Sequence, residues 1–402
     1  MRIFQSRVKP STGNTKKRDD PMRPYDLATA RAWAEIDVSK VLSNYHSALS
    51  ELAPGVSHFA VLKANAYGFG AVPMAKILYG AGCRHFAFAC VPEAVEVARA
   101  LPYDADFLVM GDTAEAEIGV VFHHKLIPTI YSFEKALLFS AEAAMRDSEL
   151  RFHCKVDTGL NRLGFSTGEA AMEISRIAKL PGLRIQGVFS HLQRRSGEFD
   201  RLQAGRLLSV SRMLQTFGIN VPMLHMLDSI GMWRYPEYQM DAVRDGAYLY
   251  GNTPNDYKRP EKISLPITLK ARVLRVHDIE AGECVGYDSD HPLQTKTCAA
   301  TLAIGYADGY PREMSHVGQV EIHGKRAPVI GTVCMDLTMV DISEIPETRV
   351  NDTAILLGGG IGIHEYIGFS GGYANEYLSR LSRRVPRVFL KDGQVVEIVT
   401  YL

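Results

Sequence analysis

Short apolar runs alternate with amphipathic stretches from Trp33 to Tyr250, and this alternation restricts the fold more than any other feature. The runs have strand length, and between most of them lie stretches with apolar residues three and four positions apart, the spacing of a helix packed by one face. Eight such runs with intervening helices predict a (β/α)8 barrel of the TIM type. The runs are His58–Lys63, Phe86–Val91, Asp106–Met110, Leu126–Ile130, Arg151–Val156, Ile185–Ser190, Met223–Leu227 and Ala247–Tyr250. The helical stretches are Val41–Leu52, Val72–Tyr79, Glu93–Leu101, Phe133–Met145, Glu169–Leu180 and Arg201–Phe217.

The pattern changes after about Ile263. Short β-rich runs follow, separated by Gly, Pro, Asp and Asn, with one helical stretch at Ala374–Leu381. Turn residues between short β-rich runs are typical of an antiparallel sheet. We therefore expect a flexible tail over residues 1–27, a barrel over 28–262 and a mainly antiparallel β domain over 263–402.

Composition disfavours several classes of function. The 402 residues include 45 Lys plus Arg and 45 Asp plus Glu, so no net charge attracts nucleic acid or anionic lipid. No apolar run approaches the roughly 18–20 residues of a membrane-spanning helix. The six cysteines form no Cys-x-x-Cys pair, which argues against a disulfide framework or a zinc site, and the first 27 residues lack the apolar core of a secretion signal. We expect a soluble, cytoplasmic protein without a metal.

Lys63 stands at the end of the first predicted barrel strand. A lysine in this position is unusual, because a buried ammonium is costly unless it is paired or neutralised. The carboxyl ends of barrel strands form the active-site face. A desolvated lysine there has a lowered pKa and is a candidate for Schiff-base formation. The spacing alone leaves open the alternative of a lysine that simply emerges into water.

Three segments resemble, in the same order along the chain, motifs of the alanine racemase family. They are Phe59–Gly68, Lys155–Gly164 and Val243–Gly251, and the resemblance spans roughly Trp33 to Leu390. Members of this family are pyridoxal 5'-phosphate (PLP) enzymes built from a barrel and a β domain. The resemblance implies an isomerase that interconverts L-alanine and D-alanine and supplies D-alanine for cell-wall peptidoglycan.

The resemblance also implies roles for residues in the first half of the barrel site. Lys63 would hold PLP covalently, and Tyr67 would contact the cofactor's phosphate. Arg162 would hydrogen-bond the ring oxygen of PLP and help orient the substrate carboxylate, a task that suits a planar guanidinium. Lys155 matches a lysine that is carbamylated in some relatives and braces that arginine.

The later strands of the barrel carry the remaining cofactor contacts that the resemblance implies. His191 and Ser229 match positions that contact the second base and the phosphate, and the amides of Gly246 and Ala247 would hold the phosphate. Arg244 would donate to the pyridine nitrogen. Because arginine offers no acceptor, that nitrogen would stay unprotonated, which weakens PLP as an electron sink and disfavours transamination.

The β domain would supply the second base. Tyr287 matches it, Tyr306 matches a residue lining the substrate entrance, and the backbone N–H of Met335 would contact the substrate carboxylate. In relatives these residues face the other subunit's barrel, so the resemblance implies a head-to-tail homodimer. Lys63 and Tyr287 would act from opposite faces of the substrate Cα, with His191 lowering the pKa of the tyrosine. Taken singly, such tyrosine and histidine residues are more often packing residues.

Among the positions that depart from the family pattern, two exchange a neutral for a charged group. Asp228 stands where the family usually has Asn, and Arg383 stands where several members have a Tyr that touches the phosphate. An unpaired buried carboxylate is costly, so we expect Asp228 to be balanced by Arg383 or Arg244. Arg383 is also expected to narrow or polarise the pocket, which leaves serine or another small amino acid as an alternative substrate.

Two further functions remain as alternatives. A barrel-type PLP amino acid decarboxylase would want a carboxylate on the pyridine nitrogen, and Arg244 argues against it. A non-enzymatic PLP carrier with a similar barrel would lack the β domain, and Tyr287 and Met335 argue against that.

Overall fold

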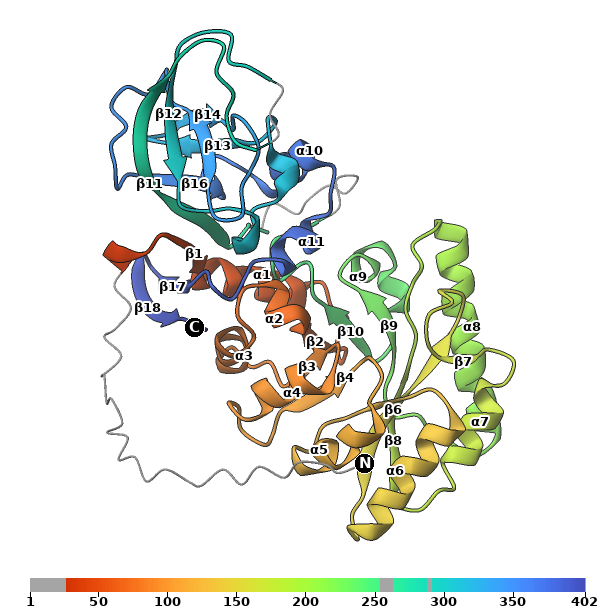
Figure 1. Ribbon diagram of the computed structural model, residues 1–402. Coiled ribbons are helices and arrows are strands. Elements are labelled where there is room, and N and C mark those ends of the chain that lie inside the picture. Colours follow the sequence, from red (N-terminus) through yellow and green to blue (C-terminus); the bar gives the residue numbers. More distant parts are fainter. Residues whose placement is uncertain (1–26, 254–262, 288–290, 402) are drawn as a thin grey trace, which may run out of the picture.

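The structure, a computed structural model, describes residues 27–253, 263–287 and 291–401 and consists of two sheets with their covering helices (Figure 1). The tail predicted over residues 1–27 lies outside the described residues except for its last position. None of the described helices is both long enough and apolar enough to span a bilayer.

The first sheet is the predicted parallel barrel. Its strands follow the order β4-β3-β2-β10-β9-β8-β6-β5, and a parallel bridge between Leu108 and Ile127 joins the two outer edges. The strands are β2 (Ser57–Val61), β3 (His85–Phe88), β4 (Asp106–Val109), β5 (Thr129–Ile130), β6 (Leu150–Asp157), β8 (Leu183–Phe189), β9 (Leu224–Asp228) and β10 (Ala242–Asp245), with β7 (Phe165–Ser166) paired to β6. Most of their residues are buried, because helices cover the outside and side chains fill the interior.

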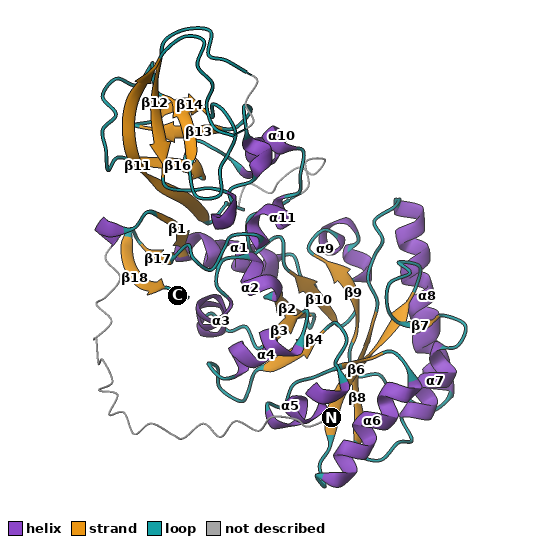
Figure 2. Ribbon diagram, in the orientation of Figure 1, coloured by secondary structure: helices purple, strands orange, loops and turns teal. Residues whose placement is uncertain are grey.

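Helices alternate with these strands and pack around them (Figure 2). The helix predicted at Phe133–Met145 has the same bounds in the structure, and its N-cap Ser132 accepts a hydrogen bond from the backbone N–H of Lys135. The helices are α1 (Val38–Ser50), α2 (Lys63–Tyr67), α3 (Ala71–Gly80), α4 (Val91–Ala98), α5 (Ile118–His123), α6 (Phe133–Met145), α7 (Ala170–Ile177), α8 (Gly197–Thr216) and α9 (Gly231–Arg234). Short 3-10 helices are η1 (Leu27–Thr29), η2 (Glu115–Glu117), η3 (Pro236–Tyr238), η4 (Tyr306–Asp308) and η5 (Arg312–Met314).

The eighth barrel strand lies earlier than predicted. The prediction placed it at Ala247–Tyr250, but β10 covers Ala242–Asp245 and the predicted residues form a turn. Tyr248, Leu249 and Tyr250 are buried all the same. These apolar residues belong to a loop that is buried against the barrel end. A short apolar run alone does not show whether the buried segment is a loop or a strand.

The second sheet forms the β domain, and its strand pairs are antiparallel except for one. Its order is β14-β13-β16-β11-β1-β17-β18, with β12 and β15 branching from β11. The strands are β1 (Ala32–Asp37), β11 (Ile267–Ile279), β12 (Thr297–Leu302), β13 (Gln319–Ile322), β14 (Lys325–Pro328), β15 (Thr338–Asp341), β16 (Thr353–Leu357), β17 (Arg387–Lys391) and β18 (Gln394–Val399). Two helices accompany it, α10 (Ile363–Ser370) and α11 (Ala374–Ser379), and α11 packs against α2 of the barrel.

The predicted N-terminal boundary of the barrel is wrong, because strand β1 belongs to the β domain. Residues 28–262 were expected to form the barrel, but β1 pairs antiparallel with β11 and parallel with β17. Its buried Ala34 and Ile36 join the β-domain sheet. The described part of the chain therefore contributes a strand to the β domain before it enters the barrel, and this long-range pairing leaves no local signal in the sequence.

Candidate active site

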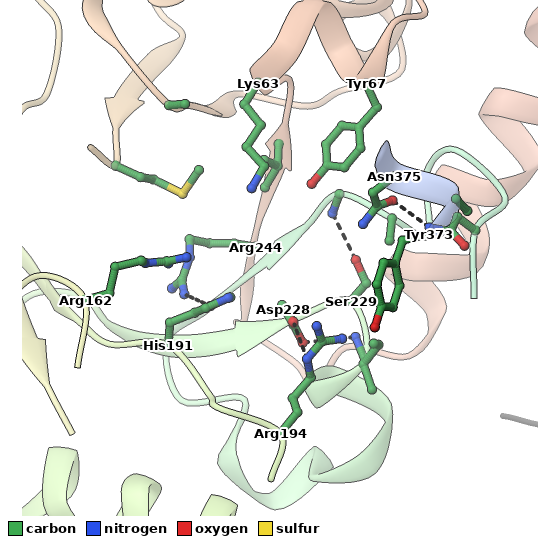
Figure 3. Close-up of a pocket in the computed structure, with 18 of the residues that line it drawn as sticks. Lys63, Tyr67, Arg162, His191, Arg194, Asp228, Ser229, Arg244, Tyr373 and Asn375 are labelled. Carbon is green, nitrogen blue, oxygen red and sulfur yellow. Dashed lines mark hydrogen bonds and ion pairs between the residues drawn. The ribbon is translucent and has the colours of Figure 1, made fainter. Parts of the chain in front are cut away.

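A cavity of about 580 Å³ opens at the carboxyl ends of the barrel strands (Figure 3). It is lined from the ends of β2, β6, β8, β9 and β10 and from the segment between α10 and α11. The structure brings together here Lys155, the candidate for carbamylation, and all the residues predicted to bind the cofactor: Lys63, Tyr67, Arg162, His191, Ser229, Arg244, Gly246 and Ala247.

Lys63 begins an unusual left-handed turn. The φ angles of Ala64, Asn65, Ala66 and Tyr67 lie between 53° and 55°. L-residues in this conformation cost about 1–2 kcal/mol each, so such a run persists only where its surroundings hold it. Glu93 accepts a hydrogen bond from the Ala64 N–H (2.7 Å). The side chains of Lys63 and Tyr67 both point into the cavity (Figure 3).

The C-terminal segment fastens the end of this turn. Arg387 is fully buried and donates to the carbonyl oxygens of Gly68 (2.8 Å), Leu381 (2.7 Å) and Ser382 (2.6 Å). Gly68 has a φ of 87°, and a Cβ there would lie 2.0 Å from the carbonyl oxygen of Leu378 in α11. Only glycine therefore allows α2 and α11 to approach this closely.

The environment of Lys63 favours its neutral amine. Burial lowers the pKa of Lys63, and the nearby guanidinium groups of Arg162 and Arg244 lower it further, while Glu93 and Asp228 act in the opposite sense. A neutral amine at the mouth of a cavity is a nucleophile for a carbonyl compound.

Arg244 is buried and held by acceptors on several sides. It donates to the carbonyl oxygens of Ser190 (2.7 Å) and Met226 (2.9 Å) and to Nδ1 of His225 (2.5 Å). Burial lowers the pKa of Arg244 to about 10, so it stays charged at neutral pH.

The contact with Arg244 also determines the tautomers of two histidines. A guanidinium can only donate, so Nδ1 of His225 carries the lone pair and its Nε2 carries the proton. That proton points to Nδ1 of His153, 2.8 Å away. Burial lowers the pKa of His225 well below its usual value and that of His153 to about 3, so both rings are neutral. The pair holds Arg244 in one orientation without adding charge.

Ser229 and Gly246 form a small polar cradle beside Tyr67. The Ser229 hydroxyl donates to Asp245 (2.7 Å) and accepts from the Gly246 N–H (3.0 Å). Asp245 is fully buried and contacts Nε2 of His58 (3.4 Å). Burial alone would lower the pKa of His58, but the contact with Asp245 outweighs it and raises the pKa to about 9. A Cβ on Gly246 would lie 2.5 Å from the Tyr67 hydroxyl, so glycine keeps this space open.

Arg162 and Lys155 line the opposite side of the cavity. The loop that carries Arg162 is held by Asp157, which accepts from the N–H groups of Gly159 (2.8 Å), Asn161 (3.1 Å) and Arg162 (3.0 Å). Lys155 lies in β6 and is buried. Burial, with Arg244 and Arg162 adding to it, lowers the pKa of Lys155 to about 7.

Asp228 has a different partner from the two that we expected. Its carboxylate pairs with Arg194, with 3.8 Å between Nε and Oδ2, and accepts from the N–H groups of Ile230 and Gly231. Burial raises the pKa of Asp228, but the surrounding groups, His191 and Arg194 first, bring it below its usual value. Arg244 contributes to this effect without forming an ion pair.

Arg383 lies away from the cavity, so the expectation that it narrows or polarises the pocket is wrong for this chain. Its side chain is 58% exposed and pairs with Glu96 of α4 at 3.4 Å. It also lies over the Tyr401 ring, 5.2 Å from the ring centroid. The surface carboxylate satisfies the guanidinium without the cost of burying it in the cavity.

Sequence reasoning missed several cavity residues. Arg194 follows β8, and the rule that strand ends form the active-site face would have identified it. Asn252, Tyr373 and Asn375 come from irregular segments that carry no periodic signal. The Asn252 amide donates to the Asn375 side-chain oxygen (2.6 Å) and so joins the barrel end to the start of α11.

The three predicted β-domain residues lie apart from this cavity within the chain. Tyr287 and Tyr306 line a separate hollow of about 660 Å³ on the β domain. The exposed fractions of Tyr287, Tyr306 and Met335 are 69%, 44% and 52%. Backbone hydrogen bonds join the loops of Tyr306 and Met335, and the buried Asp308 beside them pairs with Arg31 and Arg384. These two loops therefore form one firm surface.

Comparison with known proteins agrees with this arrangement. Residues 36–254 match the alanine racemase N-terminal domain and residues 266–389 match the alanine racemase C-terminal domain. The chain is 34% identical over 365 residues to the alanine racemase of Desulforamulus reducens, covering 89% of this chain and 98% of that protein.

Solved structures give the same result. The alanine racemase of Clostridium difficile 630 superposes with a TM-score of 0.88 at 29% identity, covering 93% of this chain and 99% of that one. The alanine racemase of Bartonella henselae, solved with covalently bound pyridoxal phosphate, gives a TM-score of 0.82 at 27% identity, covering 90% and 100%. Because both domain matches and the full-length relatives cover nearly all of the described fold, this chain belongs to the alanine racemase family.

Proposed function

We propose that this protein is a PLP-dependent alanine racemase that interconverts L-alanine and D-alanine and so supplies D-alanine for peptidoglycan. The observation that carries the proposal is Lys63, a half-buried amine with a lowered pKa that points into a cavity lined by hydroxyl and guanidinium groups. Arg383 lies outside that cavity, so the feature that suggested serine as an alternative substrate is absent from it.

The residues present fit PLP. The amine of Lys63, whose pKa is lowered by burial, suits the cofactor's aldehyde. The hydroxyl group of Tyr67, beside the open space at Gly246, suits a phosphate, and Ser229 lines the same part of the cavity. Arg244, a donor with no acceptor capacity, suits an unprotonated ring nitrogen. This donor set matches the three chemically distinct ends of the cofactor.

When bound, PLP supplies an electron sink that makes the Cα–H bond of an amino acid acidic. Lys63 is the residue on one face of that carbon, and it takes or returns the Cα proton from the D side. Arg162 would orient the substrate carboxylate, and Arg244 would donate to the ring nitrogen without protonating it. Because Arg244 keeps this sink weak, the residues favour one proton exchange at Cα over transamination.

Tyr287 serves as the base on the opposite face, from a second subunit. Its 69% exposure and its distance from the Lys63 cavity within one chain support an arrangement in which the β domain of each subunit completes the other's site. The exposed Tyr306 and Met335 belong to the same surface. A head-to-tail homodimer, with its two sites shared, satisfies this geometry.

The function is tested with purified protein, PLP and single L-amino acids in D2O, with the Cα proton followed by NMR. Loss of the L-alanine signal together with the appearance of D-alanine is expected. Tyr287→Phe should stop the exchange that starts from L-alanine. Exchange with serine and not alanine, or no exchange with PLP bound, would refute the proposal.

The shared site is tested by mixing two inactive variants, Lys63→Ala and Tyr287→Phe. In a mixed dimer one site carries both changes and the other carries neither, so random reassortment should restore about a quarter of wild-type activity. If Tyr287 acts within its own chain, every site keeps one change and the mixture stays inactive.

A further inference from the structure

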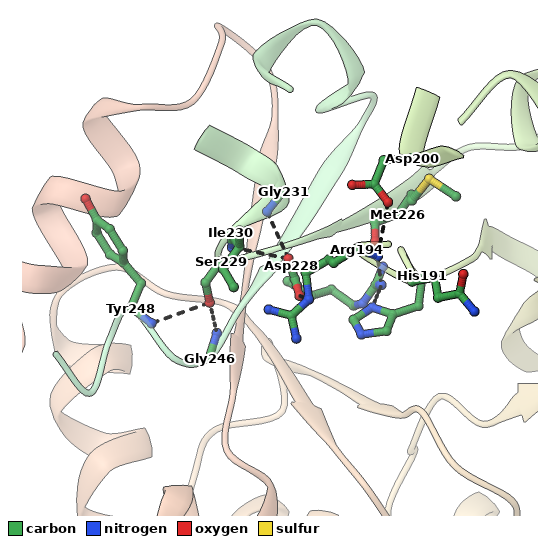
Figure 4. Close-up of polar contacts among 12 residues, drawn as sticks. His191, Arg194, Asp200, Met226, Asp228, Ser229, Ile230, Gly231, Gly246 and Tyr248 are labelled. Carbon is green, nitrogen blue, oxygen red and sulfur yellow. Dashed lines mark hydrogen bonds and ion pairs between the residues drawn. The ribbon is translucent and has the colours of Figure 1, made fainter. Parts of the chain in front are cut away.

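Arg194 is a cavity residue to which the mechanism above gives no task. It lies on the loop between β8 and α8, and its side chain reaches Asp228 at the cavity wall (Figure 4). The described residues that line the cavity carry one carboxylate, Asp228, against five basic side chains: Lys63, Lys155, Arg162, Arg194 and Arg244. Even with both lysines neutral, three guanidinium groups remain, so this is a cavity for a strongly anionic ligand.

The loop that carries Arg194 is held firmly at its base. Arg194 has a φ of 59°, a conformation that is uncommon for a residue other than glycine. Its N–H donates to Asp200 (3.0 Å), a buried residue of α8 whose other oxygen accepts from the Tyr235 hydroxyl (2.8 Å). The preceding Gln193 N–H donates to the buried Gln203 (2.8 Å). Two residues of α8 therefore set the direction in which the Arg194 side chain leaves the backbone.

The ion pair with Asp228 leaves the donors of Arg194 free. The 3.8 Å between Nε and Oδ2 exceeds a hydrogen-bond distance, and Oδ1 of Asp228 is already occupied by the N–H groups of Ile230 and Gly231. Within the described part of the chain the Arg194 guanidinium makes no hydrogen bond, and its side chain is 44% exposed. A guanidinium with free N–H groups in a cavity is suited to a phosphate or carboxylate.

The position of Arg194 favours the phosphate. Asp228 directly precedes Ser229, whose hydroxyl forms the polar cradle with Gly246. Figure 3 shows Arg194 rising toward Asp228 on the side of Ser229 and Tyr373, whereas Arg162 enters from another side of the cavity. We propose that Arg194 binds the phosphate group of PLP and that Asp228 balances the charge of Arg194 until the phosphate takes its place. This inference rests on the proposed function.

Substitutions of the two partners of this ion pair should have different effects on PLP affinity. Arg194→Gln removes a charged donor from the phosphate and should weaken PLP binding about tenfold. Asp228→Asn removes the carboxylate that competes for the guanidinium and repels the phosphate, so it should leave PLP binding unchanged or tighter. An ion pair that serves the fold alone would weaken binding in both variants.

The experiment measures dissociation constants of the apoprotein for PLP and for pyridoxal, which lacks the phosphate. Arg195→Gln is the matched control, because Arg195 is the next residue on the same loop, is exposed and lies outside the cavity lining. Arg194→Gln should lose affinity for PLP and keep its affinity for pyridoxal, while Arg195→Gln keeps both. Circular dichroism confirms that each variant is folded.

Three results would overturn the inference. Equal PLP affinity in the two glutamine variants would show that Arg194 does not bind the cofactor. An equal loss for PLP and pyridoxal would place its effect away from the phosphate. A raised KM for alanine with unchanged PLP affinity would assign Arg194 to the substrate. If the wild-type protein does not bind PLP at all, the proposed function itself fails, and this assignment with it.

Discussion

Replacing alanine by glycine usually destabilises a protein, but we expect the opposite in the left-handed turn after Lys63. Ala64 is exposed and has a φ of 53°, so its side chain contributes strain and little packing. Ala64→Gly should remove about 1–2 kcal/mol of that strain. It should also raise the conformational entropy of the unfolded chain, which costs about 0.4–1 kcal/mol. The net expectation is a gain of about 0.8 kcal/mol in the free energy of unfolding.

The matched control is Ala141→Gly. Ala141 is also exposed but lies in the right-handed helix α6, where glycine costs about 1 kcal/mol. Urea unfolding of both apoproteins, followed by circular dichroism, measures the two changes under the same conditions. The two variants should therefore move the midpoint in opposite directions. A loss of stability in Ala64→Gly equal to that in Ala141→Gly would refute the claim that the turn is strained.

Three further predictions concern individual side chains. The pKa of His58 is raised to about 9 in the folded state, so its contribution is complete below about pH 6.5 and is lost as the pH rises through 9. Over that range the wild-type protein should lose up to about 3 kcal/mol of stability relative to His58→Gln. If the urea midpoints of the two proteins change with pH by the same amount, this prediction is contradicted. Arg383→Ala should leave the ratio of kcat/KM for alanine to that for serine unchanged, because Arg383 lies outside the cavity. A change of about tenfold in this ratio would show that Arg383 contributes to the substrate pocket. Lys155, with a pKa of about 7, becomes a neutral amine above that pH and should then add CO2. A carbamate signal in 13C NMR with labelled bicarbonate should grow as the pH rises through 7 and be missing in Lys155→Arg.

The sequence predicted the barrel well because its signal is local. Each strand and helix of a (β/α)8 barrel has its own periodicity, and the helix at Phe133–Met145 needed no information from elsewhere in the chain. Strand β1 could not be placed in this way. Its partners β11 and β17 are more than two hundred residues away, and its short apolar pattern fits either sheet.

The candidate site shows the same division. Lys63 was predicted from its place at the end of a barrel strand, and Arg162 and Arg244 from the family motifs that contain them; all three line the cavity. Charge balance was harder to predict: Asp228 required a cation, but which arginine reaches it depends on the strained turn at Arg194. A long side chain leaves several partners within reach, so the backbone angle at its base makes the choice.

The charges of the cavity suggest why these residues surround Lys63. Burial keeps His153, His191 and His225 neutral at physiological pH, with pKa values of about 3 for the first two. The guanidinium of Arg244, with a pKa of about 10, is charged at neutral pH. Protonation changes near neutral pH are therefore confined to amines such as Lys155. Burial and the nearby guanidinium groups lower the pKa of Lys63 and so favour its uncharged amine, which is the form that must attack an aldehyde and accept a proton from carbon.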